Sequence, residues 1–472
     1  MERAGDDPYV RTEAAIREPP VGLWATLRNL GPGLIITGSI VGSGELILTT
    51  HLGAQVGFAF LWFILLGCVI KVFVQIEMGR HTISSGETAL EAFNRVPGPR
   101  RWGASWIVWW WVLMVITSFV QLGGIVDGLG QALQISLPAE RIGLGSGTIP
   151  FGVKGWTAVA CLSGMILLYR GRYRFVQTVT TLMVFFFTTI TVICTVALQW
   201  TEYAVTREQL LGGLRFSIPQ AGVGMAFAAF GIIGMGASEL IYYPYWCLEK
   251  GYARFVGPES SSPDWARRAR QWVRVLQADA WLSLVVYTIS TVAFYILGAA
   301  VLNARSRLPE KGQMIAVLSD MYVQTLGAWG MAIFLLGAVA VLYSTFFVAT
   351  ASNARVIADG CQVVGLVRFE SHDHRRRWVG RLCLLLPVIY YASFLIGKGH
   401  PVLLVSIGAF VQAITLPVIA GATIYLRYRR TDKRLQRRTA ADVMLWLAAI
   451  GMLAVSVYKV GTILHGLIAG KT

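Results

Sequence analysis

Long runs of apolar residues alternate with short polar and basic connections along almost the whole chain. A helix needs about 20 largely apolar residues to cross a hydrocarbon layer that is about 30 Å thick. Eleven runs come close to that length or exceed it, so the pattern predicts an all-α, polytopic membrane protein. The predicted spans cover residues 30–52, 57–79, 103–127, 155–170, 174–199, 220–247, 272–302, 324–352, 379–397, 401–427 and 440–468.

Composition and charge agree with the apolar runs. Of the 472 residues, 55% are hydrophobic and 14% are charged, whereas a soluble domain has about 25% charged residues. The net charge of +16 would also suit a nucleic-acid-binding protein, but the basic residues gather in short clusters between apolar runs and form no single amphipathic face. We therefore expect no nucleic-acid partner and interpret the clusters as signals of membrane topology.

The basic clusters predict the orientation in the membrane. Cytosolic loops are enriched in lysine and arginine. A cytosolic N-terminus places most clusters on that side, including those at 100–101, 375–377 and 427–438. Residues 1–28 contain no apolar stretch followed by a cleavage site, so we expect a cytosolic tail and no signal peptide. The sequence thus predicts a multi-pass protein of the plasma (inner) membrane with an external C-terminus.

A short motif occurs in two of the most apolar runs. The sequence reads "GSGELIL" at 42–48 and "GASELIY" at 236–242, in each case behind further glycines. A glycine inside a helix costs about 1 kcal/mol relative to alanine, so we expect both helices to be interrupted there. The two runs enter the membrane from opposite sides in the predicted topology, which is typical of a transporter with inverted repeats and a central site.

The domain organisation follows from the same pattern. No connection between the runs is long enough to suggest a separate soluble domain, so residues 1–472 are expected to form one membrane domain. We predict the first repeat at about 30–199 and the second at about 220–427, followed by an extra span at about 440–468.

The two interruptions are predicted to create a cation site. At each one, the first half-helix leaves carbonyl oxygens without partners and the second leaves amide groups. Ser43 and Ser238 are suitable N-caps for the second halves. Glu45 and Glu239 then lie in first turns, where the helix dipole favours a carboxylate. A metal ion is expected to bind Glu45, Glu239, Ser238 and the backbone carbonyl of Met235. The substrate site as a whole is expected to comprise Gly42, Ser43, Gly44, Glu45, Met235, Gly236, Ser238 and Glu239.

The motif also admits a purely structural interpretation, in which it only caps a re-entrant helix. A charged side chain near the centre of a bilayer costs about 2.5–3.5 kcal/mol, and such residues usually mark ion or proton pathways. Two copies at symmetry-related places therefore favour a functional site.

Longer stretches around the motif resemble a known family. The stretch "GPGLIITGSIVGSGELILTTHLGAQVGFAFLW" is similar to the first span of Nramp-type divalent metal transporters. Further similarity lies in "FGIIGMGASELIYY", "LGAWGMAIFLLGAVAVLYST", "RRRWVGRLCLLLP" and the Leu416-Pro417 pair, so the resemblance extends over the first ten spans. It implies a LeuT-like fold, in which five spans are repeated in inverted orientation and an eleventh is appended.

The substrate motifs depart from the Nramp pattern. The family's Asp-Pro-Gly-Asn corresponds to residues 42–45 and its Met-Pro-His to residues 238–240, so an aspartate and a sulfur ligand are missing and two glutamates are present. Oxygen ligands suit hard cations such as magnesium, calcium and manganese, which indicates a bias toward those ions. Acidic residues that resemble parts of the family's proton route correspond to Ser118 and Gln121, so we expect these two positions to bear on coupling.

Lys71 lies well inside the second apolar run. The default interpretation is a side chain whose stem extends to the inner membrane interface. The alternative is a pairing with a site carboxylate, which would give Lys71 a part in coupling.

Three functional hypotheses remain open on the sequence. The first is a secondary active transporter that moves a divalent cation by alternating access, with a proton coupled through one glutamate. The second is a LeuT-like symporter of a small organic solute, whose anionic group would bind half-helix N-termini. The third is a receptor or scaffold without transport. We find no hydrolase or metalloprotease motif and expect no enzyme, no cofactor besides the transported ion, and a monomer in the lipid bilayer.

Overall fold

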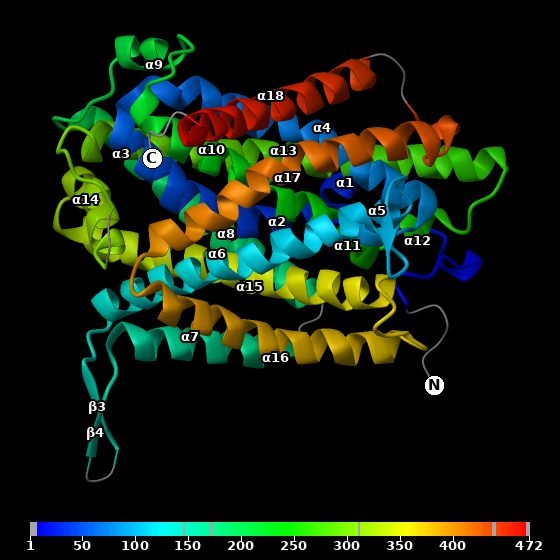
Figure 1. The fold of residues 1–472 in the computed structure, drawn as a ribbon, viewed down its shortest axis with the longest axis horizontal. Helices are drawn as coiled ribbons and strands as arrows, with labels where there is room; N and C mark the ends of the chain where they lie inside the picture. Colours follow the sequence, from blue (N-terminus) through cyan, green and yellow to red (C-terminus); the bar gives the residue numbers. More distant parts are fainter. Residues whose placement is uncertain (1–6, 145–146, 170–172, 310–311, 437–439, 469–472) are drawn as a thin grey trace.

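The computed structural model describes residues 7–144, 147–169, 173–309, 312–436 and 440–468. These residues are mostly helical (Figure 1). The α-helices are α1 (Leu23–Asn29), α2 (Pro32–Ile40), α3 (Thr50–Val56), α4 (Leu61–Ser85), α5 (Ala89–Asn94), α6 (Trp106–Ser136), α7 (Gly152–Tyr169), α8 (Tyr173–Ala197), α9 (Arg207–Gly213), α10 (Val223–Ile232), α11 (Ala237–Lys250), α12 (Tyr252–Val256), α13 (Pro263–Leu297), α14 (Met314–Leu326), α15 (Ala328–Val363), α16 (His372–Gly397), α17 (Pro401–Arg429) and α18 (Ala440–Ile468).

Shorter elements connect these helices. Two segments are π-helical, Val41–Thr49 and Gly298–Leu302. Two antiparallel hairpins pair β1 (Arg100–Arg101) with β2 (Ala104–Ser105) and β3 (Arg141–Leu144) with β4 (Gly147–Pro150). The second hairpin projects from the helical body (Figure 1). The short 3₁₀ turns are Glu13–Ala15, Gly57–Phe60, Leu198–Trp200, Gln220–Gly222 and Lys433–Leu435.

Ten helical runs among the described residues are long and apolar enough to cross a membrane. The first, Pro32–Ser85, has 54 residues, which at about 1.5 Å per residue is more than twice the thickness of the hydrocarbon layer. Within it α3 ends at Val56, the next residue is Gly57 with a φ of 62° that favours glycine, and α4 begins at Leu61. The all-α polytopic architecture is confirmed, while the division of this run into two spans, and hence the total of eleven, stays a prediction.

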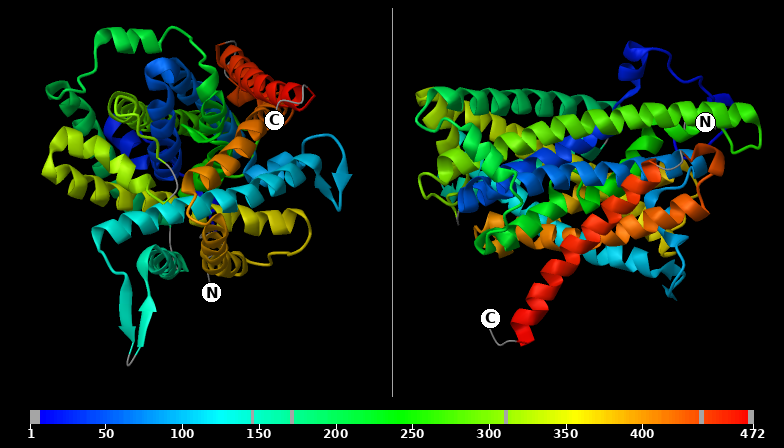
Figure 2. Two further views of the ribbon diagram at one scale, coloured as in Figure 1. Left: turned by 60° about the vertical axis from the view of Figure 1, so that its left-hand side comes forward. Right: turned by 90° about the horizontal axis from the view of Figure 1, so that it is seen from above.

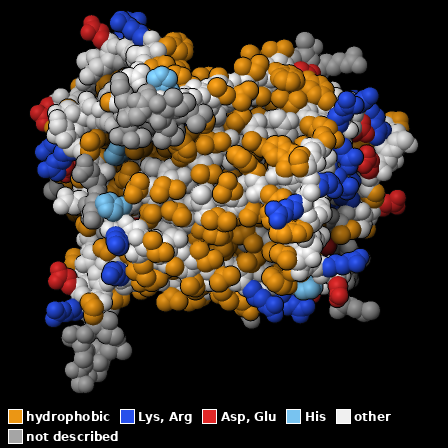
Figure 3. Space-filling view, viewed as in Figure 1, with side chains coloured by type: hydrophobic (Ala, Val, Ile, Leu, Met, Phe, Trp, Pro, Cys, Tyr) orange, Lys and Arg blue, Asp and Glu red, His pale blue; other side chains and the backbone are white. Residues whose placement is uncertain are grey.

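The helices form a bundle with a buried centre and an apolar outer surface. In Gln220–Lys250, which contains α10 and α11, 78% of the residues in the apolar 18-residue stretch are buried. The corresponding share is 28% in Tyr173–Trp200 and in Ala440–Thr462. Helices α7, α16 and α18 lie on the outside of the bundle (Figures 1 and 2). Hydrophobic side chains cover the middle of the face in Figure 3, and charged side chains gather toward its two ends. This distribution fits a protein surrounded by lipid.

Close helix packing fixes the buried run in place. A Cβ atom at Gly231 of α10 would lie 2.0 Å from the carbonyl oxygen of Ala409 in α17. Only glycine permits this approach, so α10 rests directly against α17. The segment that follows α10 is thereby positioned beside α17 in the centre of the bundle.

Candidate functional site

The second copy of the motif does interrupt its helix. Helix α10 ends at Ile232, Ile233 is extended, Gly234 has a φ of 55°, and α11 begins at Ala237. The interruption predicted for this span is therefore confirmed. The N-cap of α11 is Gly236, which has no side chain to cap with, so the capping role predicted for Ser238 is wrong. Ser238 is already inside α11, where its backbone N–H donates to Gln412 Oε1 at 2.9 Å.

The first copy of the motif does not interrupt its helix. Helix α2 continues through the π-helical segment Val41–Thr49 into α3, so the predicted break is wrong in this span. A π-helix absorbs extra residues by widening the turn, which keeps the backbone hydrogen-bonded. Thr345 of α15 supports the start of this segment, because its hydroxyl accepts from Gly42 N–H at 3.0 Å and donates to the Gly38 carbonyl at 3.0 Å. No new helix starts at Ser43, whose side chain lies outside what the structure describes.

Glu239 lies in the first turn of α11, as predicted. Its Oε1 accepts a hydrogen bond from the Ser39 hydroxyl of α2 at 2.8 Å. Its Oε2 is buried and has no hydrogen-bond partner. The carboxylate borders a small cavity of about 10 Å³, which is about the space that the centre of one water molecule occupies.

Five helices contribute the wall of this cavity, which we call the Glu239 cavity. The lining residues are Ser39 of α2, Ser118, Gln121, Leu122 and Ile125 of α6, Ser238, Glu239 and Tyr242 of α11, Thr345 and Ala349 of α15, and Gln412 of α17. Gln412 Nε2 donates to Gln121 Oε1 at 2.7 Å, so the two amides hold each other in orientation. Hydroxyl, amide and carboxylate oxygens thus surround a space for one small ion or one water molecule.

Glu45 has different surroundings. It is fully buried in the π-helical segment, its Oε1 accepts from the Thr291 hydroxyl of α13 at 2.8 Å, and its Oε2 has no hydrogen-bond partner. It does not line the Glu239 cavity. Its carboxyl group also interacts with the backbone N–H of Gly234, in the interruption between α10 and α11. Glu45 therefore lies beside the interruption but outside the Glu239 cavity, and a shared site for both carboxylates stays a prediction. The two carboxylates still interact electrostatically.

Lys71 of α4 is fully buried and does not extend to the interface. Its amino group donates to the carbonyl oxygens of Ile233, at 2.7 Å, and of Phe230. Both carbonyls belong to the end of α10, where the interrupted helix leaves them without intrahelical partners. The charge of Lys71 acts on both glutamates. The default interpretation, in which the Lys71 side chain extends to the membrane interface, is thus wrong. Its hydrogen bonds are to backbone carbonyls.

The remaining residues of the predicted site support its shape. A Cβ atom at Gly44 would lie 3.0 Å from the Ile232 carbonyl, so the π-helical segment and the end of α10 are in contact. A Cβ atom at Gly236 would lie 2.4 Å from Glu239 Oε2. Gly42 packs against Thr345, and the Met235 side chain is buried in the apolar core. Of the seven predicted substrate residues whose side chains the structure describes, which exclude Ser43, only Ser238 and Glu239 line the cavity.

Several lining residues were not predicted for the site. Ser118 and Gln121 were expected to bear on coupling and do line the cavity, whereas Ser39, Thr345 and Gln412 were missed. The only signal for Gln412 is an amide inside an otherwise apolar run. No group of three or more His, Cys, Asp or Glu side chains within the described ranges is arranged to hold a metal ion, so hydroxyl and amide oxygens would have to complete a coordination shell around Glu239.

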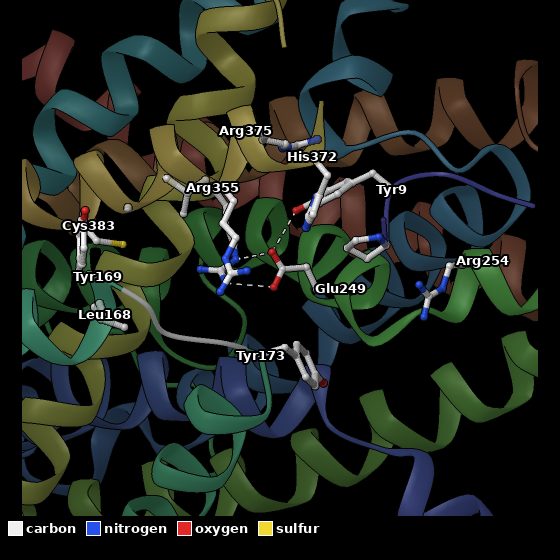
Figure 4. Close-up of a pocket in the computed structure, with 14 residues that line it drawn as sticks. Tyr9, Leu168, Tyr169, Tyr173, Glu249, Arg254, Arg355, His372, Arg375 and Cys383 are labelled. Carbon is white, nitrogen blue, oxygen red and sulfur yellow. Dashed lines mark hydrogen bonds and ion pairs between the residues drawn. The ribbon is translucent and has the colours of Figure 1, made fainter. Parts of the chain in front are cut away.

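A larger cavity, of about 260 Å³, lies where the N-terminal residues pack on the helix ends (Figure 4). Arg355 of α15 donates to Glu249 of α11 at 2.6 and 3.0 Å, and the Tyr9 hydroxyl donates to the same carboxylate at 3.2 Å. The Arg375 guanidinium of α16 lies 3.7 Å from the centroid of the Tyr9 ring. Because these charges are satisfied by one another, we interpret this region as a closure of the bundle at its predicted cytosolic end.

Comparisons with known proteins identify a family and several solved structures that are similar to this chain. The family model described as natural resistance-associated macrophage protein-like matches residues 33–462. No curated protein matches the chain. Among solved structures, the manganese transporter of Eremococcus coleocola, in complex with an aromatic bis-isothiourea substituted compound, is 14% identical, with a TM-score of 0.64 over 97% of this chain and 92% of that chain.

Two further similar structures contain organic ligands. MhsT in complex with L-phenylalanine is 14% identical, with a TM-score of 0.53 over 93% of this chain and 99% of that chain. Mhp1, a nucleobase-cation-symport-1 family transporter with bound bromovinylhydantoin, is 12% identical, with a TM-score of 0.52 over 97% and 94%. These identities establish the fold alone, and the LeuT-like fold is confirmed. Because the family model covers most of the chain, the protein belongs to the Nramp family of multi-pass membrane transporters.

Proposed function

We propose that this protein is a secondary active transporter that moves a divalent metal ion through the Glu239 cavity. The observation that carries the proposal is the unpartnered, buried Oε2 of Glu239 beside a cavity lined by oxygen atoms. Burial of an ionised carboxylate is unfavourable unless a positive charge compensates it. A cation in the cavity would supply that charge, and membership of the Nramp family supports a metal ion as the cargo.

The chemistry of the lining favours a hard ion. None of the described lining residues carries sulfur, and the polar ones offer hydroxyl, amide and carboxylate oxygens. Such ligands suit magnesium, manganese or calcium better than soft metals. We propose Glu239 and Ser238 as direct ligands, together with the Met235 carbonyl, and Glu45 as a second negative charge at the same depth of the bundle. Ser118 and Gln121 would then affect the site from α6.

Transport is proposed to follow alternating access. The relevant halves are the inverted repeats at about 30–199 and 220–427, with the span at about 440–468 outside them. Support comes from the interrupted span α10–α11, since discontinuous helices carry the midplane sites of such transporters. Proton coupling, a cytosolic N-terminus in the plasma membrane and a monomeric state complete the proposal.

The test is metal uptake into proteoliposomes by Glu239→Gln. Glutamine keeps the size of the side chain and removes its charge, so we expect uptake of Mn²⁺ to fall at least about tenfold. Glu208→Gln, at an exposed position of α9, is the matched control and should transport at the rate of the unchanged protein. Undiminished uptake by Glu239→Gln would remove the proposal.

A small organic solute is the second candidate, because MhsT and Mhp1 share the fold. The size of the Glu239 cavity argues against it, since about 10 Å³ is far below the roughly 300 Å³ or more of a typical small-molecule site. A thermal-shift screen separates the candidates. Stabilisation by organic solutes and by no metal would favour this one, and binding without uptake would indicate a receptor.

A further inference from the structure

Lys71 is placed where the interrupted helix concentrates negative potential. Phe230 O would accept from the backbone N–H of Gly234 if α10 continued, but the helix ends at Ile232. The amino group of Lys71 takes over this carbonyl and that of Ile233. It also lies 4.6 Å from the centroid of the Phe230 ring. A cation is favoured at this position, because the C-terminal end of a helix carries a partial negative charge.

Two carboxyl groups on other elements interact electrostatically with Lys71. Glu45 lies on the π-helical segment and Glu239 lies on α11. The Cys68 thiol, one turn earlier on α4, is a third titratable neighbour. The two carboxylates are buried, and each has one oxygen without a hydrogen-bond partner. Lys71 contributes positive charge near both of them.

We propose that Lys71 is a tethered counter-cation that determines the charge selectivity of the Glu239 cavity. Its ammonium group balances part of the negative charge of Glu45 and Glu239 when the cavity holds no ion. An ion that enters must then bind against the repulsion of this fixed positive charge. Lys71 thereby sets how tightly a cation binds and how well the site separates monovalent from divalent ions. The inference rests on the proposed function, since it concerns the same cavity.

The size of the effect depends on the charge of the ion. Coulomb energy is proportional to the product of the two charges, so a +2 ion loses twice as much free energy to Lys71 as a +1 ion at the same place. Because the binding free energy is proportional to the logarithm of Kd, a twofold larger free-energy change squares the factor by which Kd changes. Removal of the lysine charge should therefore tighten divalent binding by about the square of the factor for monovalent binding.

The experiment measures Kd by calorimetry on the purified full-length chain, with Mn²⁺ alone and Na⁺ alone. Lys71→Gln keeps N–H donors for the two carbonyls and removes the charge. We expect its Kd for Mn²⁺ to fall at least about tenfold and that for Na⁺ about threefold. Lys71→Arg keeps the charge and should stay within about threefold of the unchanged protein for both ions.

A matched control and a second comparison keep the result interpretable. Lys250→Gln removes another lysine that donates to a backbone carbonyl, that of Leu30, and should leave both Kd values unchanged. If Lys71→Gln alone gives no folded protein, Glu239→Gln is compared with the double variant Glu239→Gln/Lys71→Gln, and the double variant should bind Mn²⁺ at least about tenfold more tightly.

One outcome would overturn the inference about Lys71, and another would overturn the proposed function. Equal changes for Mn²⁺ and Na⁺, or weaker binding by a folded Lys71→Gln, would reduce Lys71 to a structural cap of α10 and overturn the inference. Absence of Mn²⁺ binding by the unchanged protein would overturn the proposed function itself.

Discussion

At the scale of single residues, two glutamates in nearly identical motifs have different partners. Glu239 accepts a hydrogen bond from Ser39 and borders the Glu239 cavity, whereas Glu45 accepts one from Thr291 and does not line that cavity. The sequence places both in the membrane and correctly predicts Glu239 in a first turn. It does not predict the orientation of Glu45, because Thr291 is 246 positions away along the chain. Which side chains meet a carboxylate depends on packing between distant spans.

The bond between Thr291 and Glu45 gives a prediction at this scale. Thr291→Val keeps the shape of the side chain and leaves Glu45 without this hydroxyl donor, so we expect the free energy of unfolding to fall by about 1–3 kcal/mol. Thr189→Val is the control, because Thr189 is exposed and its hydroxyl bonds only the Phe185 carbonyl of its own helix. Thermal unfolding of the purified variants measures both. Equal stability of the two variants would show that Glu45 does not depend on this bond.

At the scale of elements, one glycine-rich motif yields a π-helical segment and the other yields a break. Glycines lower the helix propensity of both spans. The sequence alone therefore does not predict which of the two spans is interrupted. In the first span, Thr345 bridges the Gly42 N–H and the Gly38 carbonyl, so the chain stays helical. In the second span, Lys71 satisfies the carbonyls at the end of α10, so the helix can stop. The choice between the two outcomes is made by side chains of neighbouring helices.

The contact between α10 and α17 gives a prediction for the elements. Gly231→Ala adds a Cβ atom 2.0 Å from the Ala409 carbonyl, so the two helices must separate. We expect a loss of about 1–3 kcal/mol in the free energy of unfolding, together with reduced metal uptake, because the break follows α10 directly. Gly421→Ala in α17 is the control, since an added Cβ atom meets nothing within 4 Å. That variant should be as stable as the unchanged protein or gain up to about 1 kcal/mol. Uptake and stability unchanged in Gly231→Ala would contradict this account.

At the scale of the whole molecule, the apolar runs predict where the chain crosses the membrane better than where its helices end. The run predicted at 103–127 belongs to α6, which continues to Ser136, and the run at 379–397 belongs to α16, which already begins at His372. The hairpin of β3 and β4 lies in the connection between the runs predicted at 103–127 and 155–170, where the hydropathy pattern predicts no element. Hydropathy marks only the part of a helix that contacts hydrocarbon. Helices that continue into water, and short elements outside the membrane, leave no comparable signal.

The orientation of the whole molecule can be tested on the two ends of one helix. Arg376 and Lys398 are exposed near opposite ends of α16, and positive charge predicts the arginine end in the cytosol. In intact spheroplasts, a membrane-impermeant maleimide should label Lys398→Cys and not Arg376→Cys, on a background in which the partly exposed Cys361 is replaced by serine. After lysis both should react. If the lysine position is shielded in spheroplasts and the arginine position is labelled, the N-terminus is external and the basic clusters do not set the topology.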